Sequence, residues 1–178
     1  MKIRIIAGQW RGRKISVLDK PGLRPTPNRL RETLFNWLTP YLPGSKCLDL
    51  FAGSGALGIE AASRGAEQVL LVEKEFDIIK NLHQHIITLN SKNIKIKQMD
   101  AITFLQKETT ETFDIVFLDP PFEQNLLIPC SNLLEPWLNK SAYIYLETNA
   151  NIIASFNNWQ IIRQKKVGQV LGTLMMKS

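Results

Sequence analysis

The chain has 178 residues, of which 44% are hydrophobic and 21% are charged, as expected for one globular domain. This composition excludes a disordered or fibrous chain, and the longest apolar runs are too short to span a membrane. Two cysteines are too few for a disulfide framework or a four-cysteine metal site. We therefore expect a cytoplasmic protein that works as a monomer and holds no metal.

The net charge of +6 is concentrated near the start of the chain. The first 46 residues hold ten lysines and arginines against two acidic residues, whereas the rest holds twelve basic and fourteen acidic residues. Clustered positive charge is typical of a surface that binds a polyanion, although the same charges could serve solubility alone. We expect a single domain, residues 1–178, in which a basic extension (1–44) precedes a core (45–178).

The extension is predicted to begin with a basic β-hairpin, whose strands at 3–7 and 14–18 flank a turn rich in glycine and arginine. A proline-rich loop follows. Thr26 is then suited to cap a helix and Pro27 to begin it. Apolar residues recur at helical spacing over the next turns, at Leu30, Leu34, Trp37 and Leu38.

From Ser45 onward, strand-like and helical segments alternate. Apolar segments of strand length lie at 46–50, 68–73, 94–99, 113–118 and 142–147. Helical periodicity lies between them, most clearly over residues 78–89. The alternation predicts an α/β fold with a doubly wound, mostly parallel sheet. The last two strand-like segments, 159–166 and 169–176, have no helix between them and predict an antiparallel hairpin at the sheet edge.

A glycine-rich segment follows the first strand of the core. Gly53, Gly55 and Gly58 have the spacing of a nucleotide-binding loop, which alone is a weak signal. Asp49 lies at the end of the preceding strand, where its carboxylate would repel a pyrophosphate and favour a cationic group such as a methionine moiety. The alternative is a buried turn that binds no ligand.

Two further carboxylates follow the next two strands. Glu73 lies twenty residues after Gly53, and a carboxylate at such a position can accept hydrogen bonds from ribose hydroxyl groups. It could equally belong to an exposed run of charged residues. Asp100 ends the third strand, where it could accept a hydrogen bond from an adenine amino group, cap the next helix, or do both.

The segment Asp119-Pro120-Pro121-Phe122 follows the fourth strand, at the edge where open α/β sheets bind ligands. The Asp119 carboxylate and the Pro120 carbonyl would accept hydrogen bonds from an exocyclic amino group. The prolines would fix that geometry, and Phe122 would offer a ring for base stacking. The alternative is a strand terminator without a ligand.

These two sites together resemble those of S-adenosylmethionine-dependent amino-methyltransferases. The extension narrows the resemblance, because residues 8–13 (Gly-Gln-Trp-Arg-Gly-Arg) and 23–36 are similar to bacterial small-subunit ribosomal RNA guanine-N2 methyltransferases. The similarity covers almost the whole chain and includes the final hairpin. Asn28 departs from the pattern, since that family commonly has an aspartate there.

The resemblance implies a seven-stranded methyltransferase fold, S-adenosylmethionine as cofactor, and methylation of N2 of one guanine in 16S ribosomal RNA, either free or in the assembling 30S subunit. The catalytic residues would be Asp119, Pro120, Pro121 and Phe122. The cofactor would be bound by Asp49, Phe51, Ala52, Gly53, Ser54, Gly55, Glu73, Lys74, Asp100, Ala101 and Asp119. RNA would be bound by Arg11, Arg13, Arg24, Arg29 and Arg31.

Two other functions are considered. DNA or RNA adenine-N6 amino-methyltransferases share Asp-Pro-Pro followed by an aromatic residue, but the DNA enzymes usually need a further target-recognition domain, for which we expect no room. An inactive RNA-binding assembly factor would keep the basic extension without activity. The intact glycine loop and intact 119–122 segment argue against that loss.

Overall fold

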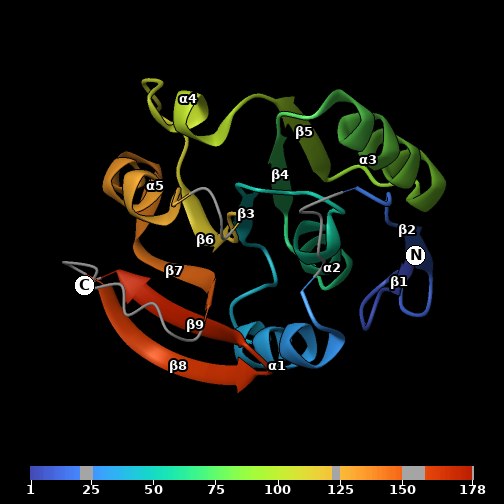
Figure 1. Ribbon diagram of the computed structural model, residues 1–178, viewed down its shortest axis with the longest axis horizontal. Coiled ribbons are helices and arrows are strands. Elements are labelled where there is room, and N and C mark those ends of the chain that lie inside the picture. Colours follow the sequence, from blue (N-terminus) through green and yellow to red (C-terminus); the bar gives the residue numbers. More distant parts are fainter. Residues whose placement is uncertain (21–25, 122–124, 150–158, 178) are drawn as a thin grey trace.

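The computed structural model describes residues 1–20, 26–121, 125–149 and 159–177. Its core strands are β3 (Lys46–Asp49), β4 (Gln68–Glu73), β5 (Ile94–Gln98), β6 (Phe113–Leu118), β7 (Leu138–Asn149), β8 (Trp159–Val167) and β9 (Val170–Lys177). They form one seven-stranded sheet in the order β5-β4-β3-β6-β7-β9-β8 (Figure 1). The strands from β5 to β7 are parallel neighbours, and β9 is antiparallel to both β7 and β8.

The sheet confirms the predicted α/β class and the antiparallel hairpin. The hairpin folds back so that β9 lies between β7 and β8, and β8 forms the edge. Strand β7 is longer than the predicted segment 142–147 at both ends, because Leu138 pairs with Phe113 of β6 and the pairing with β9 continues to Asn149.

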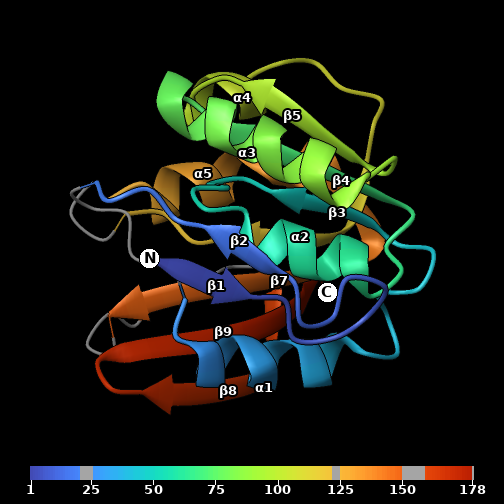
Figure 2. The ribbon, with the colours of Figure 1, turned by 90° about the vertical axis from the view of Figure 1, so that its right-hand side faces the viewer.

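The helices are α1 (Asn28–Leu38), α2 (Ala56–Ser63), α3 (Phe76–Leu89), α4 (Ala101–Leu105), α5 (Leu127–Leu133) and the short 3-10 helix η2 (Glu135–Trp137). Helices α1, α2 and α3 share one buried cluster on one face of the sheet, and α4, α5 and η2 share another on the opposite face (Figure 2). Successive strand residues alternate between the clusters, as Cys47 and Leu48 do, because side chains of a strand point to opposite faces. Among the described residues, no helix is long and apolar enough to cross a membrane.

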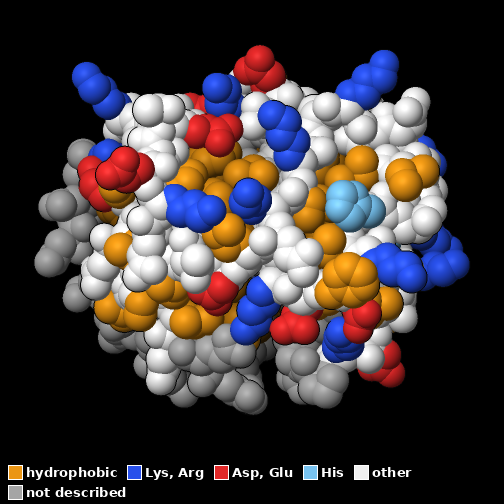
Figure 3. Space-filling view, turned by 90° about the horizontal axis from the view of Figure 1, so that it is seen from above, with side chains coloured by type: hydrophobic (Ala, Val, Ile, Leu, Met, Phe, Trp, Pro, Cys, Tyr) orange, Lys and Arg blue, Asp and Glu red, His pale blue; other side chains and the backbone are white. Residues whose placement is uncertain are grey.

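Strand β5 forms the other edge of the sheet and carries two exposed lysines, Lys95 and Lys97. Charged side chains on an edge strand discourage pairing with another chain. Basic, acidic and hydrophobic side chains are interspersed over the face seen from this side of the molecule (Figure 3). This distribution is that of a solvated surface.

Two short strands, β1 (Lys2–Arg4) and β2 (Lys14–Ser16), form the predicted N-terminal hairpin as a separate antiparallel sheet. Its apolar residues Ile3, Ile5 and Ile15 belong to the buried cluster that α1, α2 and α3 share. The hairpin is therefore packed on the core through the same apolar layer as these helices.

Helix α1 begins differently from the prediction. Its N-cap residue is Pro27 rather than Thr26, and no side chain caps the helix. Thr26 is buried, and its side chain instead forms a hydrogen bond with Glu147 in β7. The Thr26 hydroxyl group thus binds Glu147, a buried residue far away in the sequence, and does not cap α1 as the local sequence predicted.

Glu60, in α2, fastens the N-terminal segment to the core. Its carboxylate is fully buried, and it accepts hydrogen bonds from the backbone N–H groups of Ile6 at 2.8 Å and Ala7 at 3.0 Å. The Arg64 guanidinium, one turn later, forms an ion pair with the same carboxylate at 2.8 Å. A buried carboxylate needs such partners, because an unpaired charge in the interior is costly.

Ser63 continues this attachment at the end of α2. The Trp10 N–H donates to Ser63 Oγ at 3.0 Å, and that hydroxyl donates to the Ala7 carbonyl at 2.6 Å. Gly8 crosses the helix end with φ of +83°, and a Cβ there would lie 1.8 Å from the Ser63 carbonyl oxygen. Only glycine allows so close an approach.

We expect Glu60→Ala to lower the free energy of unfolding by about 3–5 kcal/mol, because it leaves two backbone N–H groups and the Arg64 charge without their acceptor. Urea denaturation measures the change. The matched control is Glu67→Ala, since the exposed Glu67 carboxylate should contribute within about 0.5 kcal/mol. A loss below about 1 kcal/mol for Glu60→Ala would contradict the role of this carboxylate.

Candidate active site

The predicted site residues meet at the carboxyl ends of the parallel strands. Asp49 ends β3 opposite Phe117 of β6, and Phe117 lies opposite Tyr145 of β7. The next residue pair between β6 and β7 is Leu118 with Leu146, so Asp119 and Glu147 follow as neighbours. Three carboxylates from different parts of the chain are therefore brought to one edge of the sheet.

The glycine-rich loop runs from β3 to the start of α2. Gly53 has φ of +49° and Gly55 has φ of +78°, which are backbone conformations that favour glycine. The Gly58 N–H, in the first turn of α2, donates to Asp49 Oδ2 at 3.0 Å. A Cβ on Gly58 would lie 2.3 Å from a Leu71 methyl group, so this glycine lets α2 lie close to β4.

Glu73 lies beside the glycine loop, as its spacing predicts. Its Oε2 atom accepts a hydrogen bond from the Gly53 N–H at 3.0 Å, and its Oε1 atom accepts from the N–H groups of Lys74 and Glu75 at 2.8 and 3.0 Å. The carboxylate is half-buried and fixed in place, so the exposed-run alternative does not describe it. Oε2 keeps a lone pair with which it could accept a ligand hydroxyl group.

Asp100 follows β5 and caps α4. Its Oδ1 atom accepts hydrogen bonds from the N–H groups of Ile102 at 3.0 Å and Thr103 at 3.1 Å. The capping alternative is thus confirmed, while Oδ2 accepts no hydrogen bond within the described part of the chain. The remaining residues proposed to bind the cofactor are buried at Ala52, Ser54 and Ala101, half-buried at Phe51 and exposed at Lys74.

The carboxylates of the site carry unusual pKa values. Burial raises the pKa of Asp49 to about 7, against the hydrogen bond from Gly58, and the charges of Glu73 and Glu147 raise it further. Burial, followed by the charges of Glu147 and Asp49, raises the pKa of Asp119 well above its usual range. Among the ion pairs of the described residues, none involves these carboxylates. A cationic ligand would supply the missing positive charge.

Glu147 and Tyr145 belong to the site but were missed from the sequence. The buried Tyr145 hydroxyl donates to Glu147 Oε1 at 2.9 Å, and burial raises the pKa of Glu147 while hydrogen bonds from Thr26 and Tyr145 lower it. Thr26 lies in the basic extension, so this network joins the extension to the neighbour of Asp119. A glutamate at the end of the apolar segment 142–146 was the available signal.

The proline segment is described in part. Asp119 is half-buried, Pro120 is buried and Pro121 is exposed, whereas Phe122 lies outside the described residues. Within the part of the chain that the structure describes, no group of three or more His, Cys, Asp or Glu side chains could hold a metal ion.

The arginines proposed to bind RNA occupy different environments. Arg11 and Arg29 are exposed, and Arg24 lies outside the described residues. Arg13 is also exposed, and its Nη2 atom donates to the Thr88 carbonyl near the end of α3 at 2.5 Å. This contact ties the hairpin to α3, in addition to any contact with RNA.

Arg31 differs from Arg11, Arg13 and Arg29, because its side chain is buried. Only 1% of Arg31 is exposed, because the helical register places it on the buried side of α1 beside Leu30 and Leu34. Its Nη2 atom donates to the Arg4 carbonyl at 2.7 Å and to Asn28 Oδ1 at 3.2 Å. The guanidinium thereby joins α1 to β1.

Comparisons with known proteins cover nearly the whole chain. The family described as "Conserved hypothetical protein 95" matches residues 3–176. The chain is 47% identical over 173 residues to ribosomal RNA small subunit methyltransferase D of Escherichia coli strain K12, covering 95% of this chain and 87% of that protein. It is 44% identical to the protein of the same name from Haemophilus influenzae, covering 95% and 91%.

A solved structure is also similar over the full length. The protein yhhF from Escherichia coli superposes with a TM-score of 0.90 at 45% identity, covering 99% of this chain and 98% of that one. The similarity thus extends from sequence to the arrangement of the sheet.

Proposed function

The chain belongs to the conserved hypothetical protein 95 family, and from this premise we propose that it uses S-adenosylmethionine to methylate N2 of one guanine in 16S ribosomal RNA. The family recognised from the sequence is confirmed by relatives named ribosomal RNA small subunit methyltransferase D. The observation that carries the proposal is the group of carboxylates Asp49, Asp119 and Glu147 beside the glycine loop. The reaction would take place in the cytoplasm.

The residues present suit this cofactor. S-adenosylmethionine is a cation at its sulfonium and ammonium groups, and the site holds buried carboxylates that pair with no cation among the described residues. Asp49 and the loop from Gly53 to Gly55 would hold the methionine end, Glu73 the ribose and Asp100 the adenine. When bound, the cofactor supplies a methyl group activated as a sulfonium.

Asp119 and Pro120 would hold the guanine amino group. The lone pair of that nitrogen is delocalised into the ring, so it is a weak nucleophile. Two acceptors that grip its hydrogens favour a pyramidal nitrogen, and alignment of this kind can supply about 7–11 kcal/mol of the barrier reduction. Burial raises the pKa of Asp119, so the positive charge of the bound cofactor would be needed to keep its carboxylate ionised and able to accept the proton that the nitrogen loses.

The preference for guanine rests chiefly on the resemblance of the basic extension to guanine-N2 methyltransferases and is supported by the acceptor chemistry. Guanine presents two adjacent donors, N1–H and the N2 amino group, whereas adenine presents an acceptor beside its amino group. Ionised carboxylates accept only, so Asp119 and its neighbour Glu147 suit the guanine edge. The base must be unpaired or flipped out, because its amino group inside a duplex cannot reach the site.

The basic extension would dock the RNA. It is fastened to α2 through Glu60 and to β7 through Thr26, which places its exposed arginines on the same body as the glycine loop. Lysine and arginine that contact phosphates release counterions, which makes such binding dependent on salt.

The proposal is tested with purified protein, labelled S-adenosylmethionine and small-subunit particles that lack the modification. We expect N2-methylguanine as the labelled nucleoside after digestion of the RNA. N6-methyladenine alone would overturn the base assignment, and RNA binding without methyl transfer would favour an assembly factor.

We expect Asp119→Ala to lower the rate of methyl transfer by about 10²–10³-fold, since an acceptor aimed at the reacting amine is lost. Affinity for S-adenosylmethionine should be largely kept, because Asp49 and Glu73 are unchanged. Turnover and calorimetry on the same variant measure the two quantities, and Asp119→Asn keeps the shape of the side chain as a control. Activity of the alanine variant within tenfold of wild type would rule out this role.

Cofactor affinity should rise with pH toward the pKa of Asp49. With that pKa near 7, a cation bound at lower pH must displace a proton, so affinity should increase by up to about tenfold per pH unit below 7 and level off above it. S-adenosylhomocysteine keeps the ammonium group but lacks the sulfonium charge, so the difference between the two ligands measures how much of the pH dependence comes from the sulfonium. Calorimetry across this range checks it, and an Asp49→Asn variant that keeps the full pH dependence would show that another group is responsible.

A further inference from the structure

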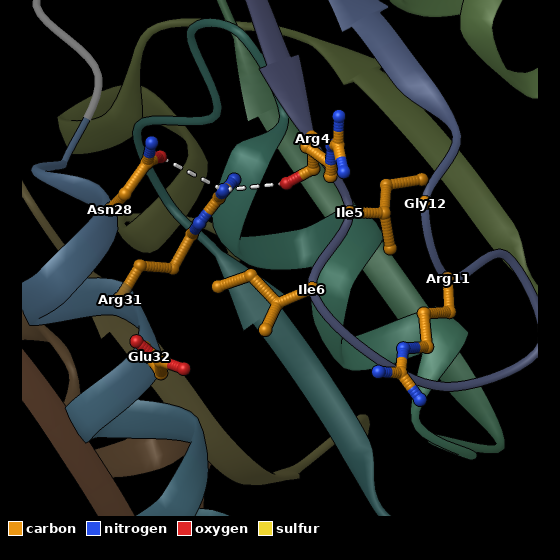
Figure 4. A pocket seen from close by; sticks show the side chains of 8 residues that line it. All are labelled: Arg4, Ile5, Ile6, Arg11, Gly12, Asn28, Arg31 and Glu32. Atoms are coloured by element: carbon orange, nitrogen blue, oxygen red, sulfur yellow. Dashed lines mark hydrogen bonds between the residues drawn. The ribbon is translucent and has the colours of Figure 1, made fainter.

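A pocket with a volume of about 290 Å³ lies between the N-terminal hairpin and the start of α1 (Figure 4). Arg31 extends from α1 toward the β1 segment, and Arg11 reaches in from the turn on the other side. The pocket is lined by Arg4, Ile5, Ile6, Arg11, Gly12, Asn28, Arg31 and Glu32. Three arginines against one glutamate give its walls a net positive charge.

Arg31 is the buried cation of this pocket. Its Nη2 atom binds the Arg4 carbonyl and Asn28, whereas its buried Nε atom has no hydrogen-bond acceptor among the described residues. Buried polar groups are nearly always paired, so a buried guanidinium N–H without an acceptor needs an explanation. The Arg31 guanidinium therefore keeps hydrogen-bond donor capacity that the described residues do not use.

Arg31 also has no carboxylate of its own among the described residues. Glu60 is the acidic group whose charge acts on it, but that carboxylate is already occupied by Arg64 and by two backbone N–H groups. Glu32 lies on the pocket wall and is exposed, so water screens its charge. The positive charge of the Arg31 guanidinium is thus only partly neutralised by nearby carboxylates.

The start of α1 adds to this charge. Asn28 is the first helical residue, no side chain caps the helix, and its first turn has no acidic residue. The unpaired N–H groups and the macrodipole of an uncapped helix start favour an anion. An anion in the pocket would therefore be attracted by the helix start, by buried Arg31 and by the exposed side chains of Arg4 and Arg11.

We propose that this pocket binds one backbone phosphate of the substrate RNA, and this inference rests on the proposed function. Guanidinium groups match the geometry of phosphate oxygens and bind them through paired N–H groups. The apolar side chains of Ile5 and Ile6 offer a surface for the adjoining sugar.

The pocket also places that phosphate relative to the reaction. Arg31 binds the Arg4 carbonyl, and two residues later Ile6 donates to Glu60 of α2, the helix that follows the glycine loop. A phosphate held here would fix the RNA at a set position from the carboxylates of the site. Binding in this pocket would therefore contribute to the choice of nucleotide.

The test uses full-length protein and two probes, inorganic phosphate and a small-subunit RNA fragment. In nuclear magnetic resonance spectra, we expect the Arg31 Nε–H signal to shift saturably with phosphate and not with chloride. Arg4→Gln combined with Arg11→Gln should weaken phosphate binding several-fold and lower the slope of log RNA affinity against log salt by about 0.7–0.9, the value for one phosphate. Arg31 is left unchanged, because it also joins α1 to β1.

The matched control is Lys95→Gln combined with Lys97→Gln, which removes the same charge from the far edge of the sheet and should leave phosphate binding unchanged. An Arg31 signal that does not move, or equal phosphate binding by both double variants, would overturn the inference. Phosphate binding in a protein that transfers no methyl group to guanine would instead overturn the proposed function and leave the pocket standing.

Discussion

The position of the basic extension depends on one buried carboxylate, that of Glu60. It has no exposed surface, and it binds the backbone N–H groups of Ile6 and Ala7 together with the Arg64 side chain. These are bonds to backbone, so they hold the path of the chain rather than particular side chains. Because α2 starts at the glycine loop, the same helix orients both the extension and the candidate cofactor site.

A second constraint is the register of the parallel strands. Pairing of β3, β6 and β7 aligns Asp49, Phe117 and Tyr145 across the sheet, and one more step brings Asp119 beside Glu147. Burial raises the pKa of Asp49 and of Asp119, and the charges of the neighbouring carboxylates raise both values further. A bound cation would stabilise the ionised form of these carboxylates.

The two constraints meet at Thr26. Its hydroxyl binds Glu147, so the loop that leads into α1 is attached to the strand next to Asp119. Arg31, one turn into the same helix, is attached to β1. The segment that leads into α1 and the first turn of this helix are thus attached to two different strands, β7 and β1.

The sequence by itself determined the fold class, the strand segments, the terminal hairpin and the glycine loop with Asp49, Glu73 and Asp100. These follow from local periodicity, glycine spacing and the rule that parallel strands end at one edge. Only the tertiary structure decided that Thr26 forms a hydrogen bond with Glu147 and does not cap α1, and that Arg31 is buried. It also showed that Glu60 and Glu147 are buried and bonded. The reason is physical: whether a polar side chain is buried depends on acceptors and donors far away in the sequence, and no local pattern contains them.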